Sequence, residues 1–278
     1  MPLTLHDILE SHRTRRPVVM GILNVTPDSF SDGGRFIDPA VAVEHARRMV
    51  ADGADILDVG AESTRPGSQR VAAAEQIARL RDVLPALRGC GALVSIDTTL
   101  AEVAEFALSQ GAAIVNDVAA GRDDPRMLGV VAQAECGYVL MHMLGEPRTM
   151  QRDPQYTDAV AEVKAFLAAR LEAAEQAGIA RSRCIVDPGI GFGKKLPHNL
   201  ALLAHVDELA ALGCPILVGP SRKRFIGELT GQSDPAKRVW GTVGACLAAW
   251  HRGATIFRVH DVAELSQALK AAAAVDQH

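Results

Sequence analysis

The chain has 278 residues, of which 48% are hydrophobic and 22% are charged, as in an ordinary globular protein. Its 29 basic and 33 acidic residues give a formal net charge of −4 with no basic block, which argues against a nucleic-acid partner. No apolar run approaches the roughly 18 residues that span a bilayer, so we expect no membrane partner. The N-terminus lacks the features of a signal peptide, and the five cysteines never show C-x-x-C spacing, so we expect a cytoplasmic protein.

Short apolar runs, often β-branched, alternate with longer stretches of helical pattern along the chain. These runs predict eight strands, at Val18–Val25, Ile56–Gly60, Leu93–Asp97, Ala113–Asp117, Tyr138–His142, Cys184–Asp187, Pro215–Gly219 and Thr255–Val259. Helical pattern fills the intervals, for example at Ala40–Ala51, Ala72–Leu87, Asp158–Gln176 and Pro235–Arg252.

Strict alternation of strand and helix indicates a parallel sheet. Eight such units in about 260 residues favour a closed (β/α)8 TIM barrel over an open doubly wound sheet. An open nucleotide-binding sheet would carry a G-x-G-x-x-G turn after its first strand, where this chain has Asn24, Val25, Thr26 and Pro27. We therefore expect an α/β chain with a single domain over residues 1–278, its barrel at about residues 17–275.

Polar side chains stand at the end of every predicted strand, where the chemistry of such barrels lies. They are Asn24, Asp58 with Glu62 beyond it, Asp97, Asn116 with Asp117, His142, Asp187, the turn Ser221-Arg222-Lys223, and Arg258 with His260. Any one of them could simply cap the following helix, and for Asp58 and Asp117 capping is the favoured interpretation. For His142 we favour a satisfied core histidine. Eight converging ends nevertheless indicate a ligand site.

The candidate site divides by charge. Asp97, Asn116 and Asp187 are acceptors, which suits a heterocycle that presents adjacent N–H donors. The donor groups of Lys223, Arg258 and His260 suit a phosphate or pyrophosphate.

Two further features concern the groups around this site. An amide oxygen such as that of Asn24 can help to hold Mg²⁺. Lys223 directly follows a buried strand, so we expect it to face the site, with Arg222 and Arg224 as a solvated pair.

Three loops after the predicted strands are long or rich in glycine. Those at Thr26–Asp38 and Ala61–Arg70 exceed the two to six residues that most such loops need, which predicts lids. The third, DPGIGFGKK at residues 187–195, lets backbone approach a flat ligand closely, and its Phe192 offers a wall for an aromatic substrate.

Eight motifs occur in one order along residues 18–262. They are GILNVTPDSFSDGG (21–34), ESTRPG (62–67), SIDT (95–98), VND (115–117), MHM (141–143), DPGIGFGK (187–194), SRK (221–223) and RVHDV (258–262). In this combination the chain resembles the dihydropteroate synthase family of the folate pathway. The resemblance implies a magnesium-dependent homodimer that condenses 6-hydroxymethyl-7,8-dihydropterin pyrophosphate with p-aminobenzoate, giving 7,8-dihydropteroate and pyrophosphate.

The resemblance also implies roles for individual residues. It places pterin binding at Asp97, Asn116, Asp187 and Lys223, with Met141, Phe192 and Arg258 beside them. It places pyrophosphate at Asn24, Thr64, Arg65, Arg258 and His260, with Asn24 also at the metal. The p-aminobenzoate site would comprise Phe30, Thr64, Pro66, Phe192, Lys223 and Arg224, and catalysis would depend most on Asp97, Lys223 and Asn24.

The chain departs from the family pattern at two places. Thr99 and Leu100 stand where an aromatic and a basic residue are common, and Arg224 stands where many relatives have a serine near the aminobenzoate carboxylate. Either Arg224 or the helix N-terminus is expected to meet that anion.

Three other functions stay open at this point. A pterin-dependent methyltransferase barrel would share the acceptors, although the phosphate-side groups Arg258 and His260 and the two long loops argue against it. A Schiff-base aldolase would use Lys223 as nucleophile but leaves the carboxylates unexplained. A non-catalytic pterin-binding homologue would keep the same residues.

Overall fold

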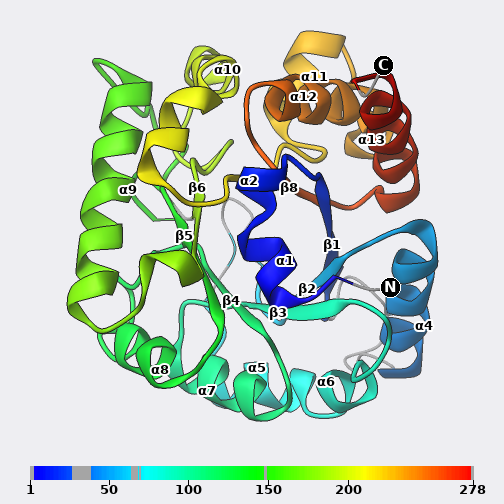
Figure 1. Cartoon of the computed structure of the whole chain (residues 1–278), viewed down its shortest axis with the longest axis vertical. Helices are drawn as coiled ribbons and strands as arrows, with labels where there is room; N and C mark the ends of the chain where they lie inside the picture. Colours follow the sequence, from blue (N-terminus) through cyan, green and yellow to red (C-terminus); the bar gives the residue numbers. More distant parts are fainter. Residues whose placement is uncertain (1–2, 27–38, 64–67, 69, 147–148, 277–278) are drawn as a thin grey trace.

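The computed structural model describes residues 3–26, 39–63, 68, 70–146 and 149–276. Its eight strands are β1 (Val18–Asn24), β2 (Ile56–Gly60), β3 (Leu93–Asp97), β4 (Ile114–Asp117), β5 (Gly137–Met141), β6 (Cys184–Asp187), β7 (Leu217–Val218) and β8 (Ile256–Val259). All pair in parallel in the order β6-β5-β4-β3-β2-β1-β8-β7, and a bridge between Val186 and Ile216 joins the two ends. The predicted TIM barrel is therefore confirmed, and Figure 1 shows the strands as a ring inside the helices.

The helices that follow the strands cover the outside of the ring. They are α4 (Pro39–Asp52), α5 (Ala73–Leu80), α6 (Val83–Ala86), α7 (Ala101–Ser109), α8 (Met127–Gln133), α9 (Ala159–Gln176), α10 (Leu196–Ala204), α11 (Arg224–Thr230), α12 (Val239–His251) and α13 (Val262–Asp276). Three short 3-10 helices add η1 (Arg181–Arg183), η2 (Val206–Leu212) and η3 (Pro235–Lys237). Among the described residues, no helix is long and apolar enough to cross a membrane.

Two predicted helices are divided in the structure. The stretch 72–87 breaks between α5 and α6, because Pro85 has no N–H to donate to the carbonyl of Arg81. The stretch 235–252 begins as η3, where the Asp234 side chain accepts from the Ala236 N–H at 3.0 Å, and continues as α12 after Arg238. Neither break moves a strand end.

Two helices that precede the first strand close the N-terminal mouth of the barrel. These are α1 (Leu5–Leu9) and α2 (Ser11–Thr14), which cross the centre of the ring in Figure 1. Ile8 packs with barrel residues such as Met20 and Ile56 in an apolar cluster. The Ser11 hydroxyl lies 2.9 Å from that of Thr255, just before β8. The described residues thus fill the N-terminal end of the barrel, which leaves the opposite end for a ligand.

Candidate active site

The inward-facing side chains change character along each strand. Residues two apart in a strand face the same side, and the lower inward positions form the apolar cluster, for example Ile56, Ile114, Ile185 and Ile256. Two residues further along each of these strands, the inward-facing residues are Asp58, Asn116, Asp187 and Arg258. The last inward-facing residue of β3 is Asp97. These polar groups are buried or nearly so. Because alternate residues of each strand face the barrel interior, these five side chains lie together at the C-terminal end of the barrel. We call this group the floor of the site.

Arg258 links this floor across the barrel. Its Nε donates to Asp58 Oδ2 at 2.6 Å and its Nη2 to Asp97 Oδ2 at 2.7 Å. Asp58 Oδ2 also accepts from the Asn116 side-chain amide at 3.0 Å. Side chains from β2, β3, β4 and β8 thus form one hydrogen-bonded network. The expectation that Asp58 caps a helix is wrong, because its carboxylate is fully buried and faces the barrel interior.

Asp117, next to Asn116, faces away from the site. Its carboxylate accepts from the backbone N–H of Ala119 at 2.8 Å and of Gly121 at 2.6 Å, and from the Tyr138 hydroxyl at 2.9 Å. Burial raises its pKa to about 6 in spite of these three donors. Asp117 therefore stabilises the turn after β4, in agreement with the capping role favoured from the sequence.

The two carboxylates that remain available to a ligand lie on opposite parts of the ring. Burial raises the pKa of Asp97, and Arg258 opposes that rise. Burial also raises the pKa of Asp187, whose Oδ1 accepts from the Gly189 N–H at 2.7 Å. The positive charges of Lys194, Lys223 and Arg258 oppose this rise in the pKa of Asp187.

Lys223 reaches the site across the glycine-rich loop. Its Nζ donates to the carbonyl of Ile190 and lies 4.4 Å from the centre of the Phe192 ring. A Cβ at Gly191 would lie 2.6 Å from Lys223 Cδ, so only glycine lets the lysine pass. Burial lowers the pKa of Lys223 to about 7. The prediction that Lys223 faces inward agrees with this geometry.

The two arginines beside Lys223 differ. Arg222 is half-buried, with a positive φ of 57°, and its Nε donates to Asp261 Oδ2 at 3.0 Å. The expectation that it is solvated is wrong, because the loop after β8 brings a carboxylate to it. Arg224 is exposed, at the first position of α11, and pairs with Glu228 at 2.8 Å.

The described phosphate-side groups predicted from the sequence lie at the ends of β1 and β8 and in the turn directly after β8. His260 Nδ1 lies 2.9 Å from the Ser221 hydroxyl, which also accepts from the His260 backbone N–H at 3.1 Å. Asn24 is half-buried at the end of β1. Phe30, Thr64, Arg65 and Pro66, with Ser29 on the first loop, lie outside the described residues.

An apolar wall stands between β5 and the glycine-rich loop. Met141 packs with Val118, Met143 and Met150, and Phe192 lies against this cluster. His142 is buried behind it, and its ring packs edge-on against Phe166 with centroids 4.8 Å apart. It is a core histidine, as favoured from the sequence, but its partner Lys194 was missed. Lys194 and Lys195 stand side by side in the sequence, and nothing local distinguishes the buried lysine from the exposed one.

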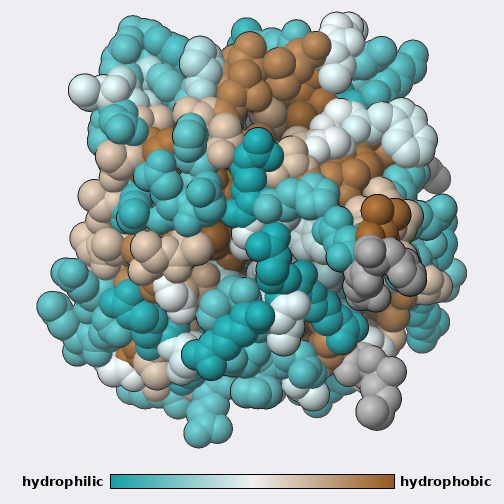
Figure 2. Space-filling view, turned by 45° about the horizontal axis from the view of Figure 1, so that its top comes forward, coloured by the Kyte–Doolittle hydropathy of each residue, from teal (hydrophilic) through white to brown (hydrophobic). Residues whose placement is uncertain are grey.

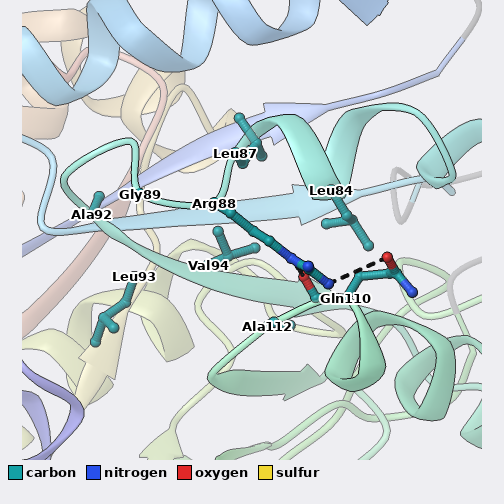
Figure 3. Close-up of a pocket in the computed structure, with 10 residues that line it drawn as sticks. Leu84, Leu87, Arg88, Gly89, Ala92, Leu93, Val94, Gln110 and Ala112 are labelled. Carbon is teal, nitrogen blue, oxygen red and sulfur yellow. Dashed lines mark hydrogen bonds between the residues drawn. The ribbon is translucent and has the colours of Figure 1, made fainter.

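A hollow at the other end of the barrel has a different character. Figure 3 shows it between the segment after α6, the start of β3 and the segment between α7 and β4, with Arg88 pointing toward Gln110. Its lining includes Leu93 and Val94 at the start of β3, whereas Asp97 ends that strand. No carboxylate or histidine lines it. We therefore place the active site at the C-terminal ends of the strands.

The sequence predicts a Mg²⁺ ion at Asn24. Within the described ranges, no group of three or more His, Cys, Asp or Glu side chains could hold a metal ion. Asn24 nevertheless provides an amide oxygen at a strand end, which is a ligand type that suits Mg²⁺ when substrate phosphates and waters complete the coordination.

Comparison with known proteins identifies the family of the chain. The family model described as pterin binding enzyme matches residues 20–260. Dihydropteroate synthases of Synechocystis and Neisseria meningitidis serogroup B are 46% and 49% identical, covering 94% and 92% of this chain and 91% of each relative. The structure of Xanthomonas albilineans dihydropteroate synthase in complex with 7,8-dihydropteroate matches with a TM-score of 0.86 and 45% identity, covering 99% of this chain and 95% of that one. The chain therefore belongs to the pterin-binding enzyme family that includes the dihydropteroate synthases.

Proposed function

We propose that the chain condenses 6-hydroxymethyl-7,8-dihydropterin pyrophosphate with p-aminobenzoate, releasing 7,8-dihydropteroate and pyrophosphate. The observation that carries this proposal is the floor of the site, where Arg258 from β8 donates to Asp58 on β2 and Asp97 on β3, and Asn116 on β4 donates to Asp58. A transferase of this kind needs acceptors for a heterocycle and cations for a leaving group, and no side-chain nucleophile. The similarity to the dihydropteroate synthases of Synechocystis and Neisseria meningitidis supports the same reaction.

The pterin is proposed to lie on this floor. The carboxylates of Asp97 and Asp187 and the side-chain oxygen of Asn116 accept from its ring N–H groups, and Lys223 donates to it. Met141 and Phe192 cover its faces, as their apolar cluster suggests. Because burial desolvates both carboxylates, their interaction with positive charge is strong.

The pyrophosphate is proposed to lie beside the pterin, toward β1 and β8. Arg258 and His260 donate to it there, with Thr64 and Arg65 from the second loop. Asn24 would hold Mg²⁺, which supplies a Lewis acid for the leaving phosphate oxygens. Pyrophosphate release that persists unchanged in excess EDTA would contradict the metal requirement.

The reaction is proposed to be dissociative. The bond from the pterin methylene to pyrophosphate breaks first, and the electron pair leaves with the pyrophosphate. Asp97 and Asp187 then stabilise the positive charge shared by methylene and ring. The arylamine nitrogen attacks the methylene carbon and loses a proton, so no strong general base is needed. Phe30, Pro66 and Arg224 are proposed to line the amine site, and the two long loops to exclude water.

A pyrophosphate-release assay with and without p-aminobenzoate tests the proposal. The wild type should turn over only with both substrates, and Asp97→Asn should lower kcat/KM by roughly 100-fold or more. Asp117→Asn is the matched control, because it removes a buried carboxylate of the neighbouring strand that faces away from the site. Equal losses in both variants would contradict the assignment.

Three other measurements would indicate the alternatives. Methyl transfer from a methylated pterin without pyrophosphate release would indicate the methyltransferase. Borohydride trapping at Lys223 would indicate the aldolase, and pterin binding without turnover the non-catalytic homologue. A homodimer and a cytoplasmic location stay predictions. Leu229 on α11 and Trp240 on α12 are exposed. The face in Figure 2 combines hydrophilic surface with hydrophobic patches. Light scattering would test the dimer.

A further inference from the structure

Lys194 is a buried lysine that the proposed reaction does not use. Only 3% of its surface is exposed, although it follows the glycine-rich loop directly. A buried ammonium or amine requires partners, because its desolvation is costly otherwise. Its Nζ lies 2.9 Å from His142 Nδ1, and it donates to the Phe192 carbonyl at 2.9 Å and to the His142 carbonyl at 3.4 Å. These acceptors belong to two different loops.

The first loop follows β5 and carries His142, directly after Met141. The second follows β6 and carries Phe192. The two loops approach with little space between their backbones, since a Cβ at Gly189 would lie 1.9 Å from the His142 carbonyl oxygen. A Cβ at Gly193 would lie 2.5 Å from the carbonyl oxygen of Leu144. Lys194 therefore holds together two loops that already fit closely.

Both loops carry the residues that form the apolar wall of the site. Met141 and Phe192 pack in the same cluster. Lys194 contacts the ring of His142, which directly follows Met141, and the carbonyl of Phe192 itself. The Phe192 ring in turn lies 4.4 Å from Lys223 Nζ. A shift of this loop would move both the wall and the environment of Lys223.

We propose that Lys194 is a positioning residue that fixes the Phe192 wall against the loop after β5 and so sets the affinity of the site for the pterin ring. The proposal rests on the proposed function, because it assumes that a pterin occupies this floor. The Lys194 ammonium itself touches no substrate. Its role is exerted through the carbonyl of Phe192 and through His142.

The test compares Lys194→Met with Lys195→Met. Lys195 is the adjacent residue, and its ion pair with Asp153 lies at the surface. Lys195→Met therefore removes an ammonium group of the same kind without removing a contact between the two loops. Binding of 6-hydroxymethyl-7,8-dihydropterin and of inorganic pyrophosphate with Mg²⁺ is measured by calorimetry. Lys194→Met should raise the pterin dissociation constant by roughly 10- to 100-fold and leave the pyrophosphate value within twofold. Lys195→Met should change neither.

A double-mutant cycle distinguishes positioning from stability alone. His142→Phe keeps a ring against Phe166 but removes the Nδ1 acceptor, so it should raise the pterin dissociation constant severalfold. The double variant should be no weaker than Lys194→Met, because both changes break the same contact. Unchanged pterin affinity in folded Lys194→Met, or failure of both single variants to fold, would show that Lys194 serves stability only. If the wild type turns over both substrates, either of these outcomes contradicts the role of Lys194 and leaves the proposed function intact.

Discussion

Replacing Asp58 by asparagine removes one charge from the floor of the site while keeping the size of the side chain. Asp58 Oδ2 accepts one charge-assisted bond from Arg258 and one neutral bond from Asn116. Its other oxygen, Oδ1, has no hydrogen-bond partner among the described residues. Asparagine can still accept one bond, and Arg258 keeps its second partner, Asp97. The change therefore weakens the network without abolishing it.

The structure gives the expected size of this effect. Removing one partner of a buried ion pair typically costs about 3–5 kcal/mol, and a charge-assisted bond contributes roughly 1.5–3 kcal/mol. Because Asp97 still pairs with Arg258, we expect the cost of one lost charge-assisted bond, about 2 kcal/mol of unfolding free energy. For a domain of this size, that corresponds to a decrease in Tm of roughly 5 °C. Because Arg258 and Asn116 lose their common anchor, kcat/KM should also decrease by roughly 10- to 100-fold.

Thermal unfolding and the pyrophosphate-release assay measure the two effects. Asp55→Asn is the control, since Asp55 lies just before the same strand at its opposite end and accepts the Val19 N–H at 2.9 Å. An asparagine can accept that bond as well, so kcat/KM should stay unchanged. If Asp58→Asn kept the Tm and the kcat/KM of the wild type, the network around Arg258 would have no part in stability or function.

Three further predictions concern stability, pH and the amine site. Burial lowers the pKa of both Lys194 and Lys223 from 10.5 to about 7, so between pH 7 and 10.5 the unfolded chain binds more protons and the free energy of unfolding should rise with pH. Urea unfolding at pH 7 and pH 9 should show a smaller rise for Lys223→Met than for the wild type; equal rises would contradict the lowered pKa. Tyr138→Phe removes the hydroxyl bond to Asp117 and should cost about 1 kcal/mol in urea unfolding with no change in KM, whereas an altered pterin KM would place Asp117 in the site after all. Arg224→Ala should raise the KM for p-aminobenzoate severalfold and leave the pterin KM unchanged, with Glu228→Ala, which removes the partner of Arg224, as the control; steady-state kinetics in which Arg224→Ala had no effect would assign the carboxylate to the N-terminus of α11.

The positions of the strands followed from the sequence because they depend on local pattern. A short apolar run between two helical segments suits a parallel strand covered on both faces, and all eight strands lie where this pattern predicts them. Their polar ends then had to converge, since parallel strands in a closed barrel all end at one rim. Asp97, Asn116 and Asp187 are therefore predictable as candidates from the sequence alone.

Only the tertiary structure decided which polar groups bind each other. Asp58 and Arg258 are 200 positions apart in the sequence, and their contact depends on the closure of the barrel between β1 and β8. The burial of Lys194 and the exposure of Lys195 likewise depend on the loop after β5, which packs against one of them and leaves the other in solvent. Local pattern determines where a chain forms strands and where its polar residues fall. Pairing inside the site is determined by distances between residues that are remote in sequence, and these distances exist only once the barrel has closed.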